Sequence, residues 1–145
     1  MLFRSVTHHH LRASSVVLDV PLSDYVRDLS KLLSIADYCA SRGFALALDD
    51  VSNTHGLAKL LAEIRPAFVK LDGKFGQGIN TVKRDTMLRE IIQLAHENGA
   101  TVLGEGIENQ AMYDMYFEAG VDMFQGYFIG MPERHTLAKI VPATM

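Results

Sequence analysis

The sequence has a single cysteine, no cluster of basic residues and no long apolar run. Cys39 has no second cysteine with which to form an internal disulfide bond, so we expect a buried, reduced thiol in a cytoplasmic protein. A membrane-spanning helix needs about 18 consecutive apolar residues. No segment approaches that length, so we expect no membrane contact. The net charge of −3, with scattered lysines and arginines, argues against a nucleic acid polymer as partner.

The composition predicts a folded chain with one main domain. Of its 145 residues, 48% are hydrophobic, and the slightly positive mean hydropathy argues against disorder. Residues 1–14 show neither strand nor helix periodicity, so we expect an irregular lead-in there, followed by a domain over residues 15–145. The adjacent histidines at positions 8–10 could bind metal, but such stretches are more often solvated. We therefore expect them to have no role.

Apolar segments alternate with helical patterns along the chain, which predicts a βα repeat and an α/β fold. The apolar segments cover residues 15–20, 44–50, 67–72, 100–106 and 121–127. Helical patterns with clear ends run from Ser23 to Gly43, from Asn80 to Asn98 and from Asn109 to Gly120. Each begins at a residue type that caps helices and closes at or beside a glycine, which favours three separate helices.

Strands joined by single helices run parallel, because such a crossover returns the chain in the same direction. The sheet is therefore either a doubly wound layer or part of a (β/α)8 barrel, and in both folds ligands bind at the carboxyl ends of the strands. Strand alternation places Phe68, Lys70 and Asp72 on one face of their strand. The lysine and the aspartate need paired charges or a polar cavity on that face.

Acidic side chains stand at or just after the carboxyl ends of the first four predicted strands. They are Asp19, Asp49, Asp50, Asp72, Glu105 and Glu108, with Lys70 as the cation among them. Hard oxygen ligands in this number suit Mg²⁺ or Mn²⁺ better than zinc. Two such metals that share a carboxylate can clamp a displacement at phosphorus, and the adjacent Asp49 and Asp50 could each serve such a pair.

Structural explanations are also open for individual residues of this group. Asp50 could cap the following helix, Asp72 could pair with Lys70, and Glu108 could lie in the first turn of a helix, where the dipole favours it. Gln125, at the end of the last strand, could hold a water or a base edge, or could pair with the backbone. The occurrence of all these acids at equivalent strand ends favours a functional site.

Three blocks of the sequence resemble the signature motifs of EAL domains, the bacterial cyclic-di-GMP phosphodiesterases. They are LDDVSNTHGLAKLLAEIRPAFVKLD, GEGIEN and FQGYFIGMP. The family patterns are DDFGTGYSSL, LKID, AEGVET and QGY followed by a proline, and their order and spacing match from Asp49 to Pro132. Asp19 falls where the family has the first glutamate of its E-L-T-E strand. The resemblance covers most of the chain.

The resemblance implies a TIM-type barrel, divalent metals and hydrolysis of one phosphodiester of cyclic-di-GMP to the linear dinucleotide. The implied metal ligands are Asp19, Asp49, Asp50 and Asp72. By the same resemblance, Lys70 holds the attacking water and Glu105 assists as ligand or base. Glu108 anchors the loop after the paired aspartates, and Gln125 lines the substrate pocket.

The sequence also departs from the family pattern. The E-A-L motif and a metal-binding asparagine, which the family carries upstream of the position of Asp19, are absent from the sequence. Three strands are missing with them, so we expect a partial (β/α)8 barrel of about five parallel βα units. Asp19 is one methylene shorter than the family glutamate, and VSNTHG lacks both glycines that shape the family loop. We therefore expect weakened binding of Mg²⁺ or Mn²⁺.

These features predict a truncated, degenerate cyclic-di-GMP phosphodiesterase domain that is inactive alone. The alternative is a non-catalytic cyclic-di-GMP receptor or a protein-interaction module in bacterial signalling. Exposed sheet edges in a partial barrel predict a homodimer or a complementing N-terminal segment. An enolase-like lyase would also place lysine and acids at strand ends, but the ordered GEGIEN and QGY blocks argue against it.

Overall fold

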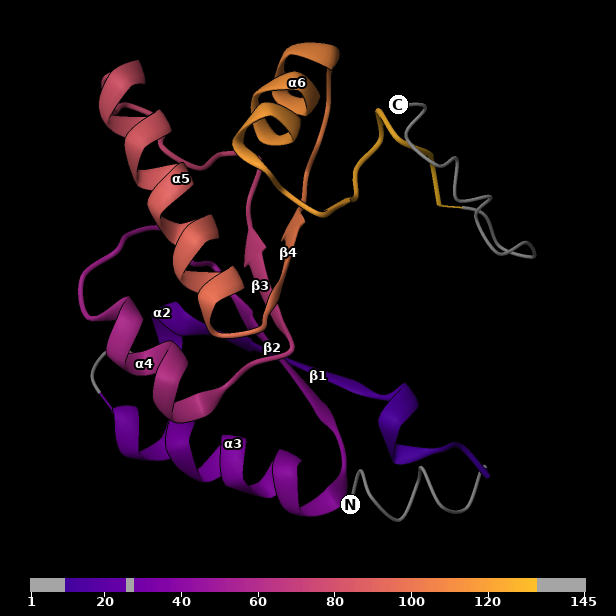
Figure 1. Ribbon diagram of the computed structural model, residues 1–145. Coiled ribbons are helices and arrows are strands. Elements are labelled where there is room, and N and C mark those ends of the chain that lie inside the picture. Colours follow the sequence, from indigo (N-terminus) through magenta and orange to yellow (C-terminus); the bar gives the residue numbers. More distant parts are fainter. Residues whose placement is uncertain (1–9, 26–27, 133–145) are drawn as a thin grey trace.

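The computed structural model describes residues 10–25 and 28–132 and contains a parallel sheet of five strands with helices between them (Figure 1). The strands are β1 (Val17–Pro21), β2 (Ala45–Asp49), β3 (Phe68–Leu71), β4 (Thr101–Gly104) and β5 (Met123–Phe124). Their order in the sheet is β1-β2-β3-β4-β5, and every neighbouring pair is parallel. The predicted α/β fold of about five parallel βα units is confirmed.

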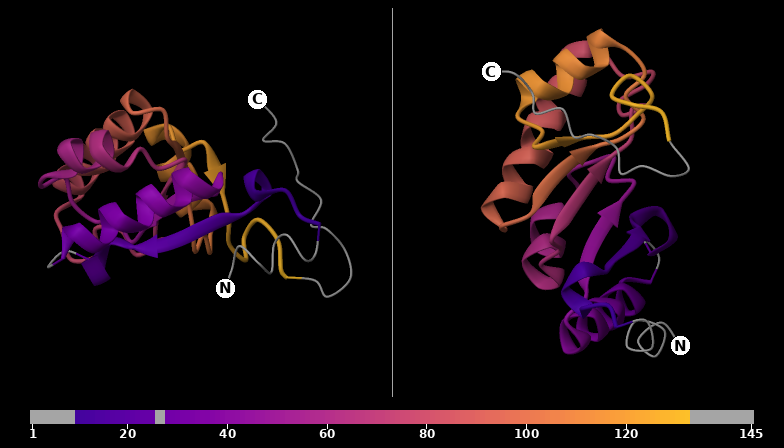
Figure 2. Two further views of the ribbon diagram at one scale, coloured as in Figure 1. Left: turned by 90° about the horizontal axis from the view of Figure 1, so that it is seen from below. Right: turned by 90° about the vertical axis from the view of Figure 1, so that its right-hand side faces the viewer.

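Helices α3 (Leu29–Arg42), α4 (Leu57–Ile64), α5 (Thr81–Glu97) and α6 (Gln110–Ala119) lie together on one side of this sheet (Figure 2). The chain also contains the 3-10 turn η1 (Ala13–Ser15) before β1 and the short α-helix α2 (Leu22–Tyr25) after it. Helices α3 to α6 form the covering layer, because α3 packs against α4, α4 against α5 and α5 against α6. The opposite face of the sheet carries the other strand side chains, Lys70 and Asp49 among them.

The hydrophobic core lies between the sheet and this layer of helices. Leu48, Val69 and Val102, from three neighbouring strands, are completely buried. They belong to one cluster with Leu61 of α4 and Ile91 of α5. Burial of each such side chain contributes about 1.5–3 kcal/mol. Since successive residues of a strand point to opposite faces, this core fixes which residues point away from the helices.

The first predicted helix is wrong at its beginning. A single helix starting at Ser23 was expected, but Ser23 lies inside the short α2 and a separate helix, α3, begins at Leu29. The reason is the Asp28 carboxylate, which accepts hydrogen bonds from the hydroxyl of Ser30 and the backbone N–H of Lys31. These bonds lower the pKa of Asp28 and make it the N-cap, so the chain enters α3 there. The predicted end at Gly43 is confirmed.

The two later helices begin at the predicted asparagines. The side chain of Asn80 accepts a hydrogen bond from the N–H of Val82, and that of Asn109 accepts one from Met112. Gly120 follows α6 with a φ of 98°, a left-handed conformation that an L side chain rarely adopts. Sequence signals at both ends of a helix were therefore sufficient in this half of the chain.

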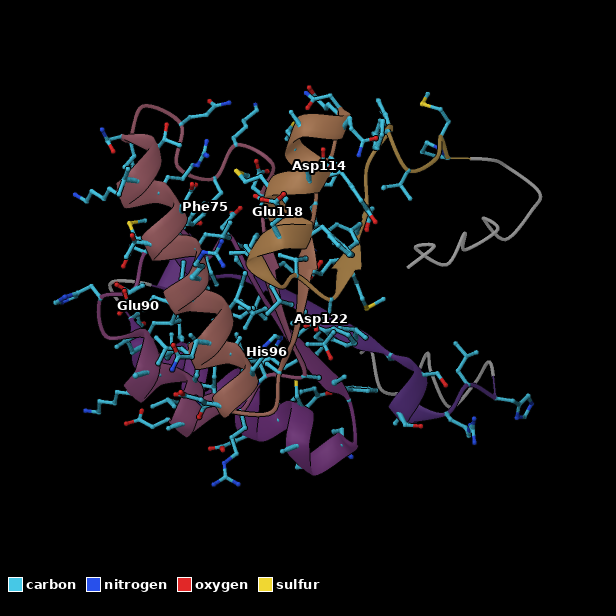
Figure 3. The ribbon with its side chains drawn as sticks, turned by 45° about the horizontal axis from the view of Figure 1, so that its top comes forward. Phe75, Glu90, His96, Asp114, Glu118 and Asp122 are labelled. Atoms are coloured by element: carbon cyan, nitrogen blue, oxygen red, sulfur yellow. The ribbon has the colours of Figure 1, made fainter. Side chains whose placement is uncertain are left out.

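Helix α5 is tied to the sheet near its carboxyl end. His96 Nε2 lies at a hydrogen-bond distance of 2.8 Å from Oδ2 of Asp122, just before β5, and Asp122 also accepts the N–H of Val102 in β4 (Figure 3). Towards the other end of α5, Asp85 pairs with Arg84 at 2.8 Å. The Asp85 carboxylate therefore pairs with the residue directly before it in the sequence.

The strands are shorter than their apolar segments, and β5 contains only Met123 and Phe124 of the predicted 121–127. The predicted lead-in over 1–14 and the domain over 15–145 stay predictions, and His8 and His9 lie outside the described residues. In residues 10–25 and 28–132, no helix is both long and apolar enough to cross a membrane.

Candidate functional site

The sheet brings four of the predicted site residues to one place. Lys70 lies in β3, Asp49 is the last residue of β2 and Glu105 directly follows β4. The register pairs Leu48 with Val69, so Asp49 comes alongside Lys70. Parallel pairing directs aligned side chains to the same face, and these residues therefore point away from the helices.

The ammonium group of Lys70 is surrounded by carboxylates. Its Nζ lies 2.5 Å from Oδ2 of Asp19, 2.9 Å from Oε1 of Glu105 and 3.5 Å from Oδ2 of Asp49. We call these four residues the Lys70 cluster. Asp19 comes from β1, so the cluster joins four consecutive strands or strand ends. Three of the six acids that were expected to converge around this cation therefore reach it.

Lys70 is the one buried charged residue in the part of the chain that the structure describes, with 8% of its surface exposed. A buried ammonium is strongly unfavourable unless it is paired and hydrogen-bonded. Burial alone lowers the pKa of Lys70, but the hydrogen bonds to Asp19 and Glu105 and the charges of Glu105 and Asp49 outweigh it. The pKa is raised above its usual value, and Lys70 stays protonated.

Asp50 takes a different position from its neighbour Asp49. It is exposed and has a φ of 56°, and its backbone N–H donates to Oδ1 of Asp49 at 2.8 Å. The next helix, α4, begins only at Leu57, with Gly56 in the capping position. The capping explanation for Asp50 is therefore wrong, and its carboxylate is presented to solvent beside the cluster.

Asp72 also stays outside the cluster. Its carboxylate accepts the backbone N–H of Lys74 at 2.6 Å, whereas Lys70 pairs with the other three acids. The simple explanation of an Asp72 to Lys70 pair is therefore wrong. The backbone carbonyl of Asp72 accepts hydrogen bonds from Phe75 and from the hydroxyl of Tyr116 in α6.

Tyr116 is a positioning residue that sequence reasoning missed. Its side chain is completely buried, and its hydroxyl reaches the Asp72 carbonyl at 2.5 Å. Burial, and then the charge of Asp72, raise the pKa of Tyr116 above its usual value. The sequence showed only an aromatic residue in the apolar stripe of a helix, and a hydroxyl without a sequence-local partner gives no further signal.

Glycines hold the loops after β3, β4 and β5 against one another. A Cβ on Gly73 would lie 2.5 Å from the carbonyl oxygen of Gly106, and a Cβ on Gly126 would lie 2.3 Å from backbone atoms of Ile107. Such distances are far below van der Waals contact, so both positions need glycine. The glycine of QGY is thus explained by the close approach of its loop to Ile107, and Gly106 of GEGIEN by its positive φ of 63°.

Glu108 and Gln125 lie on these loops and are exposed. The backbone of Gln125 donates to Gly104 and accepts from Ile107, which extends the pairing beyond β5. Among the described residues, the side chains of Glu108 and Gln125 make no hydrogen bond or ion pair. Both are therefore open to a ligand at the carboxyl edge of the sheet.

The carboxylates fit a divalent metal by chemistry, since Mg²⁺ and Mn²⁺ prefer oxygen ligands. The positions of these carboxylates, however, do not form a metal site. Within residues 10–25 and 28–132, no group of three or more aspartate, glutamate, histidine or cysteine side chains is placed to hold a metal. The point on which Asp19, Asp49 and Glu105 converge is taken by the Lys70 ammonium.

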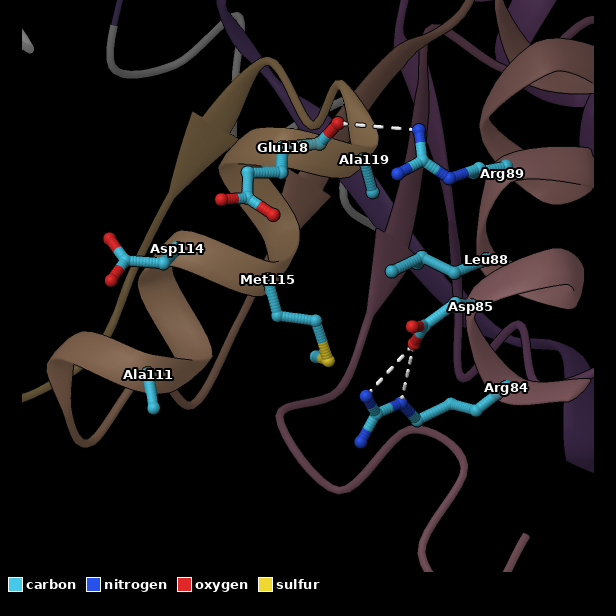
Figure 4. A pocket seen from close by; sticks show the side chains of 9 residues that line it. All are labelled: Arg84, Asp85, Leu88, Arg89, Ala111, Asp114, Met115, Glu118 and Ala119. Carbon is cyan, nitrogen blue, oxygen red and sulfur yellow. Dashed lines mark hydrogen bonds and ion pairs between the residues drawn. The ribbon is translucent and has the colours of Figure 1, made fainter. Parts of the chain in front are cut away.

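A cavity of about 390 Å³ lies between α5 and α6, away from the cluster (Figure 4). It is lined by Arg84, Asp85, Leu88, Arg89, Ala111, Asp114, Met115, Glu118 and Ala119. The Arg84 to Asp85 pair stands at one end, and at the other Arg89 donates to the carbonyl of Glu118 (Figure 4). The cavity shares no residue with the Lys70 cluster.

Known proteins are similar to this chain in sequence and in fold. Probable cyclic di-GMP phosphodiesterase PdeA of Escherichia coli (strain K12) is 26% identical over 133 residues, which cover 91% of this chain and 18% of that protein. Cyclic di-GMP phosphodiesterase RocR of Pseudomonas aeruginosa is 27% identical over 135 residues, which cover 91% of this chain and 34% of that protein. The chain therefore spans about a fifth to a third of the length of these relatives.

Among solved structures, the PaMucR phosphodiesterase in complex with c-di-GMP superposes with a TM-score of 0.79 at 21% identity, covering 91% of this chain and 54% of that one. The YkuI protein of Bacillus subtilis, with an EAL domain, substrate c-di-GMP and calcium, gives 0.77 at 23%, covering 94% and 34%. Klebsiella pneumoniae BlrP1, with manganese and c-di-GMP, gives 0.75 at 19%, covering 90% and 34%.

These structural neighbours are TIM-barrel domains, so the five βα units correspond to part of such a barrel. The sequence model of the EAL domain matches residues 1–132. That range contains the Lys70 cluster and the closely packed loops at Gly73 and Gly126. The chain belongs to the EAL domain family.

Proposed function

We propose that this chain carries the acid and lysine part of a cyclic-di-GMP phosphodiesterase site and that it does not hydrolyse cyclic-di-GMP by itself. The observation that carries the proposal is the Lys70 cluster at the carboxyl ends of parallel strands, where barrel enzymes bind their substrates. The homologues PdeA and RocR are named as cyclic di-GMP phosphodiesterases, which supports the substrate class.

The proposed catalytic residues are Lys70 and Glu105. An ammonium has three N–H donors, and three carboxylates lie within 3.5 Å of the Lys70 Nζ. Hydrogen bonds to Asp19 and Glu105 occupy two of these donors, and Asp49 lies 3.5 Å from the Nζ, so at most one donor is left to orient an attacking water. Glu105 is likewise engaged with the ammonium at 2.9 Å, which removes it from work as a base. Both restraints support an inactive isolated chain.

The proposed metal ligands are Asp19, Asp49, Asp50 and Asp72, and the proposed metal is Mg²⁺ or Mn²⁺. Structural neighbours solved with calcium or manganese support a divalent cation in the family. Two of the proposed ligands, Asp19 and Asp49, are already bound to Lys70, so we propose that metal binding by this chain is weak.

Substrate contacts are proposed for Glu108 and Gln125. Both are exposed on the loops after β4 and β5, on the side of the sheet edge where the cluster lies. A glutamine amide can donate to and accept from the edge of a guanine base. Close backbone contacts at Gly73 and Gly126 bring the loops that carry the two side chains near one another.

For partners, we propose that the edge strands β1 and β5 of the described sheet pair with a second copy or with a complementing N-terminal segment. For location, we propose the cytoplasm, since Cys39 is a buried free thiol. We also keep residues 15–145 as a single proposed domain.

The proposal is tested by incubating the chain with Mg²⁺ or Mn²⁺ and cyclic-di-GMP and separating the nucleotides by chromatography. We expect no linear dinucleotide above the level of a sample without protein. Sustained turnover in the wild type that is abolished by Asp49→Asn would overturn the inactivity of the chain.

A non-catalytic receptor is the second candidate, favoured by the side chains of Glu108 and Gln125, which are exposed and make no hydrogen bond or ion pair within the described part of the chain. Calorimetric titration with cyclic-di-GMP separates it from a pure interaction module. A receptor gives saturable binding that is weakened by Gln125→Ala, and Tyr127→Ala, at an exposed neighbour, is the matched control. Absence of binding would leave the interaction module.

A further inference from the structure

Four aromatic rings meet at the surface beside β5, an edge strand of the described sheet. Tyr113 in α6 stacks on Phe117, with 5.8 Å between the ring centroids. The Tyr113 ring also lies 4.7 Å from that of Phe124 and 6.2 Å from that of Phe128. Phe117 is nevertheless 53% exposed, and Phe128 is exposed as well. The described residues therefore cover this aromatic cluster only in part.

Exposed apolar side chains continue from the cluster along the segment after β5. Tyr127, Ile129 and Met131 follow one another there at every second position, and all three are exposed. We call the exposed members of both groups the β5 patch, which consists of Phe117, Tyr127, Phe128, Ile129 and Met131. At about 100 Å² for each half-exposed large side chain, the patch offers about 500 Å² of apolar surface. The largest patch of a typical monomer measures about 300–600 Å² and is often a binding surface.

The acidic side chains of α6 lie on a different side of the helix from the β5 patch. Asp114 and Glu118 line the cavity towards α5, whereas Tyr113 and Phe117 belong to the aromatic cluster. Residues four apart share one side of a helix, which explains both pairs. All five members of the patch are uncharged. Two identical surfaces can face each other when they oppose no like charges, and the β5 patch meets that condition.

The size of the patch fits a second copy of the chain. Specific interfaces bury about 1,200–2,000 Å² in total, half of it on each partner. Two β5 patches placed against each other would bury about 1,000 Å², which corresponds to a weak dimer. A two-fold axis, the commonest symmetry of soluble dimers, covers both patches at once. The same axis brings the two β5 edges together, and exposed strand edges favour such association.

We propose that a second copy of this chain covers the β5 patch, patch against patch, about a two-fold axis. The proposal goes beyond the phosphodiesterase site, because the patch shares no residue with the Lys70 cluster. For the edge at β5, it selects the second copy from the two kinds of partner proposed above.

The test measures association of the full chain by sedimentation equilibrium, without nucleotide, in the wild type and in Phe117→Asp, Phe117→Lys and Val82→Asp. We expect the wild type to dimerise with a dissociation constant of about 10 µM, as befits a small interface. Either charge at position 117 should raise that constant at least about 100-fold, because two like charges would face each other in the interface. Val82 of α5 is 75% exposed and lies outside the patch, so Val82→Asp should dimerise like the wild type.

An equimolar mixture of Phe117→Asp and Phe117→Lys tests the symmetric arrangement. When the two patches face each other, opposite charges meet in the mixed dimer, so its dissociation constant should return to within about tenfold of the wild-type value. A mixture that stays monomeric would overturn the pairing of patch against patch, because an interface between the patch and a different surface gains nothing from mixing.

A wild type that stays monomeric far above the expected dissociation constant would also overturn the proposal. Another protein, or a segment outside the described residues, would then cover the patch. A dimer that survives both substitutions of Phe117 would place the interface elsewhere. If these variants do not fold, Met131→Asp and Met131→Lys replace them in the same comparison, since Met131 is exposed. All these measurements are made without cyclic-di-GMP, so their failure leaves the proposed function unchanged.

Discussion

The two faces of the sheet are made by the same strands but are held together in different ways. On the covered face, Leu48 and Val69 are completely buried under helices. On the other face, Lys70 is buried and its charge is balanced by ion pairs, while the side chain of its partner Asp19 is 54% exposed. Stability therefore comes mainly from the covered face, while the open face holds charges in a defined geometry at a cost in desolvation.

The difference between the two faces explains why the ion pairs of the open face could not be predicted from the sequence. Apolar packing is non-directional, so a periodic pattern is sufficient to place Leu48 or Val69. Ion pairs depend on side-chain reach and on which strands are neighbours. Lys70 accordingly pairs with acids of three other segments and not with Asp72, two residues away.

The largest expected effect is on the covered face. Leu32 of α3 is completely buried, and Leu32→Ala should lower the free energy of unfolding by about 2–5 kcal/mol through lost burial and a cavity. Leu29→Ala in the same helix is the matched control, since Leu29 is 49% exposed. Urea denaturation measures both. Equal losses would contradict the assignment of the buried face of α3.

The next effect is on the open face. Lys70→Met leaves three carboxylates facing one another, and we expect a loss of about 2–3 kcal/mol in unfolding free energy. The control is Lys59→Met, whose side chain is 84% exposed in a pair with Glu63 and should change little. A Lys70→Met protein as stable as the wild type would mean that the cluster organises charge without stabilising the fold.

A smaller loss of stability is expected at Tyr116 of α6, whose hydroxyl donates to the backbone carbonyl of Asp72 after β3. Tyr116→Phe removes the hydrogen bond to the Asp72 carbonyl, which keeps the bond from Phe75, so we expect a loss of about 1 kcal/mol. Because the pKa of Tyr116 is raised in the folded state, its hydroxyl stabilises the protein below the unfolded pKa, about 10. That contribution is lost as the pH rises above 10 towards the folded value.

Urea unfolding at a series of pH values measures this difference. The wild type should lose more stability than Tyr116→Phe as the pH rises through about 10. Tyr127→Phe, at a side chain that is 67% exposed, should follow the wild type. Parallel pH curves for the wild type and Tyr116→Phe would contradict the burial of the hydroxyl.

The smallest effect is at the start of α6. Asn109→Ala removes the side-chain bond to the N–H of Met112 and should lower the free energy of unfolding by about 1 kcal/mol. Asn109→Asp keeps an oxygen in the same place and should retain most of the stability. If alanine and aspartate gave the same result by thermal unfolding, the cap would not contribute.

Much of the fold could be predicted because its signals are local. Asn80 and Asn109 begin helices, Gly43 and Gly120 end them, and the alternation around Lys70 placed it on the charged face. The break before α3 was missed because Ser23 and Asp28 are both capable N-caps, and only the hydrogen bonds made by Asp28 separate them. Two competing local signals cannot be ranked from residue type alone.

Of the candidate site, the sequence by itself determined that a lysine and several acids lie in or directly after the strands, because strand and helix periods are properties of a local segment. It did not place Asp19, which lies in the middle of β1 and not at its end. Only the tertiary structure decided that Asp19, Asp49 and Glu105 enclose the Lys70 ammonium while Asp50 and Asp72 stay outside. It also decided that Tyr116 supports the Asp72 loop. These pairings join residues far apart in the sequence, so they exist only once the strand order brings their side chains within reach.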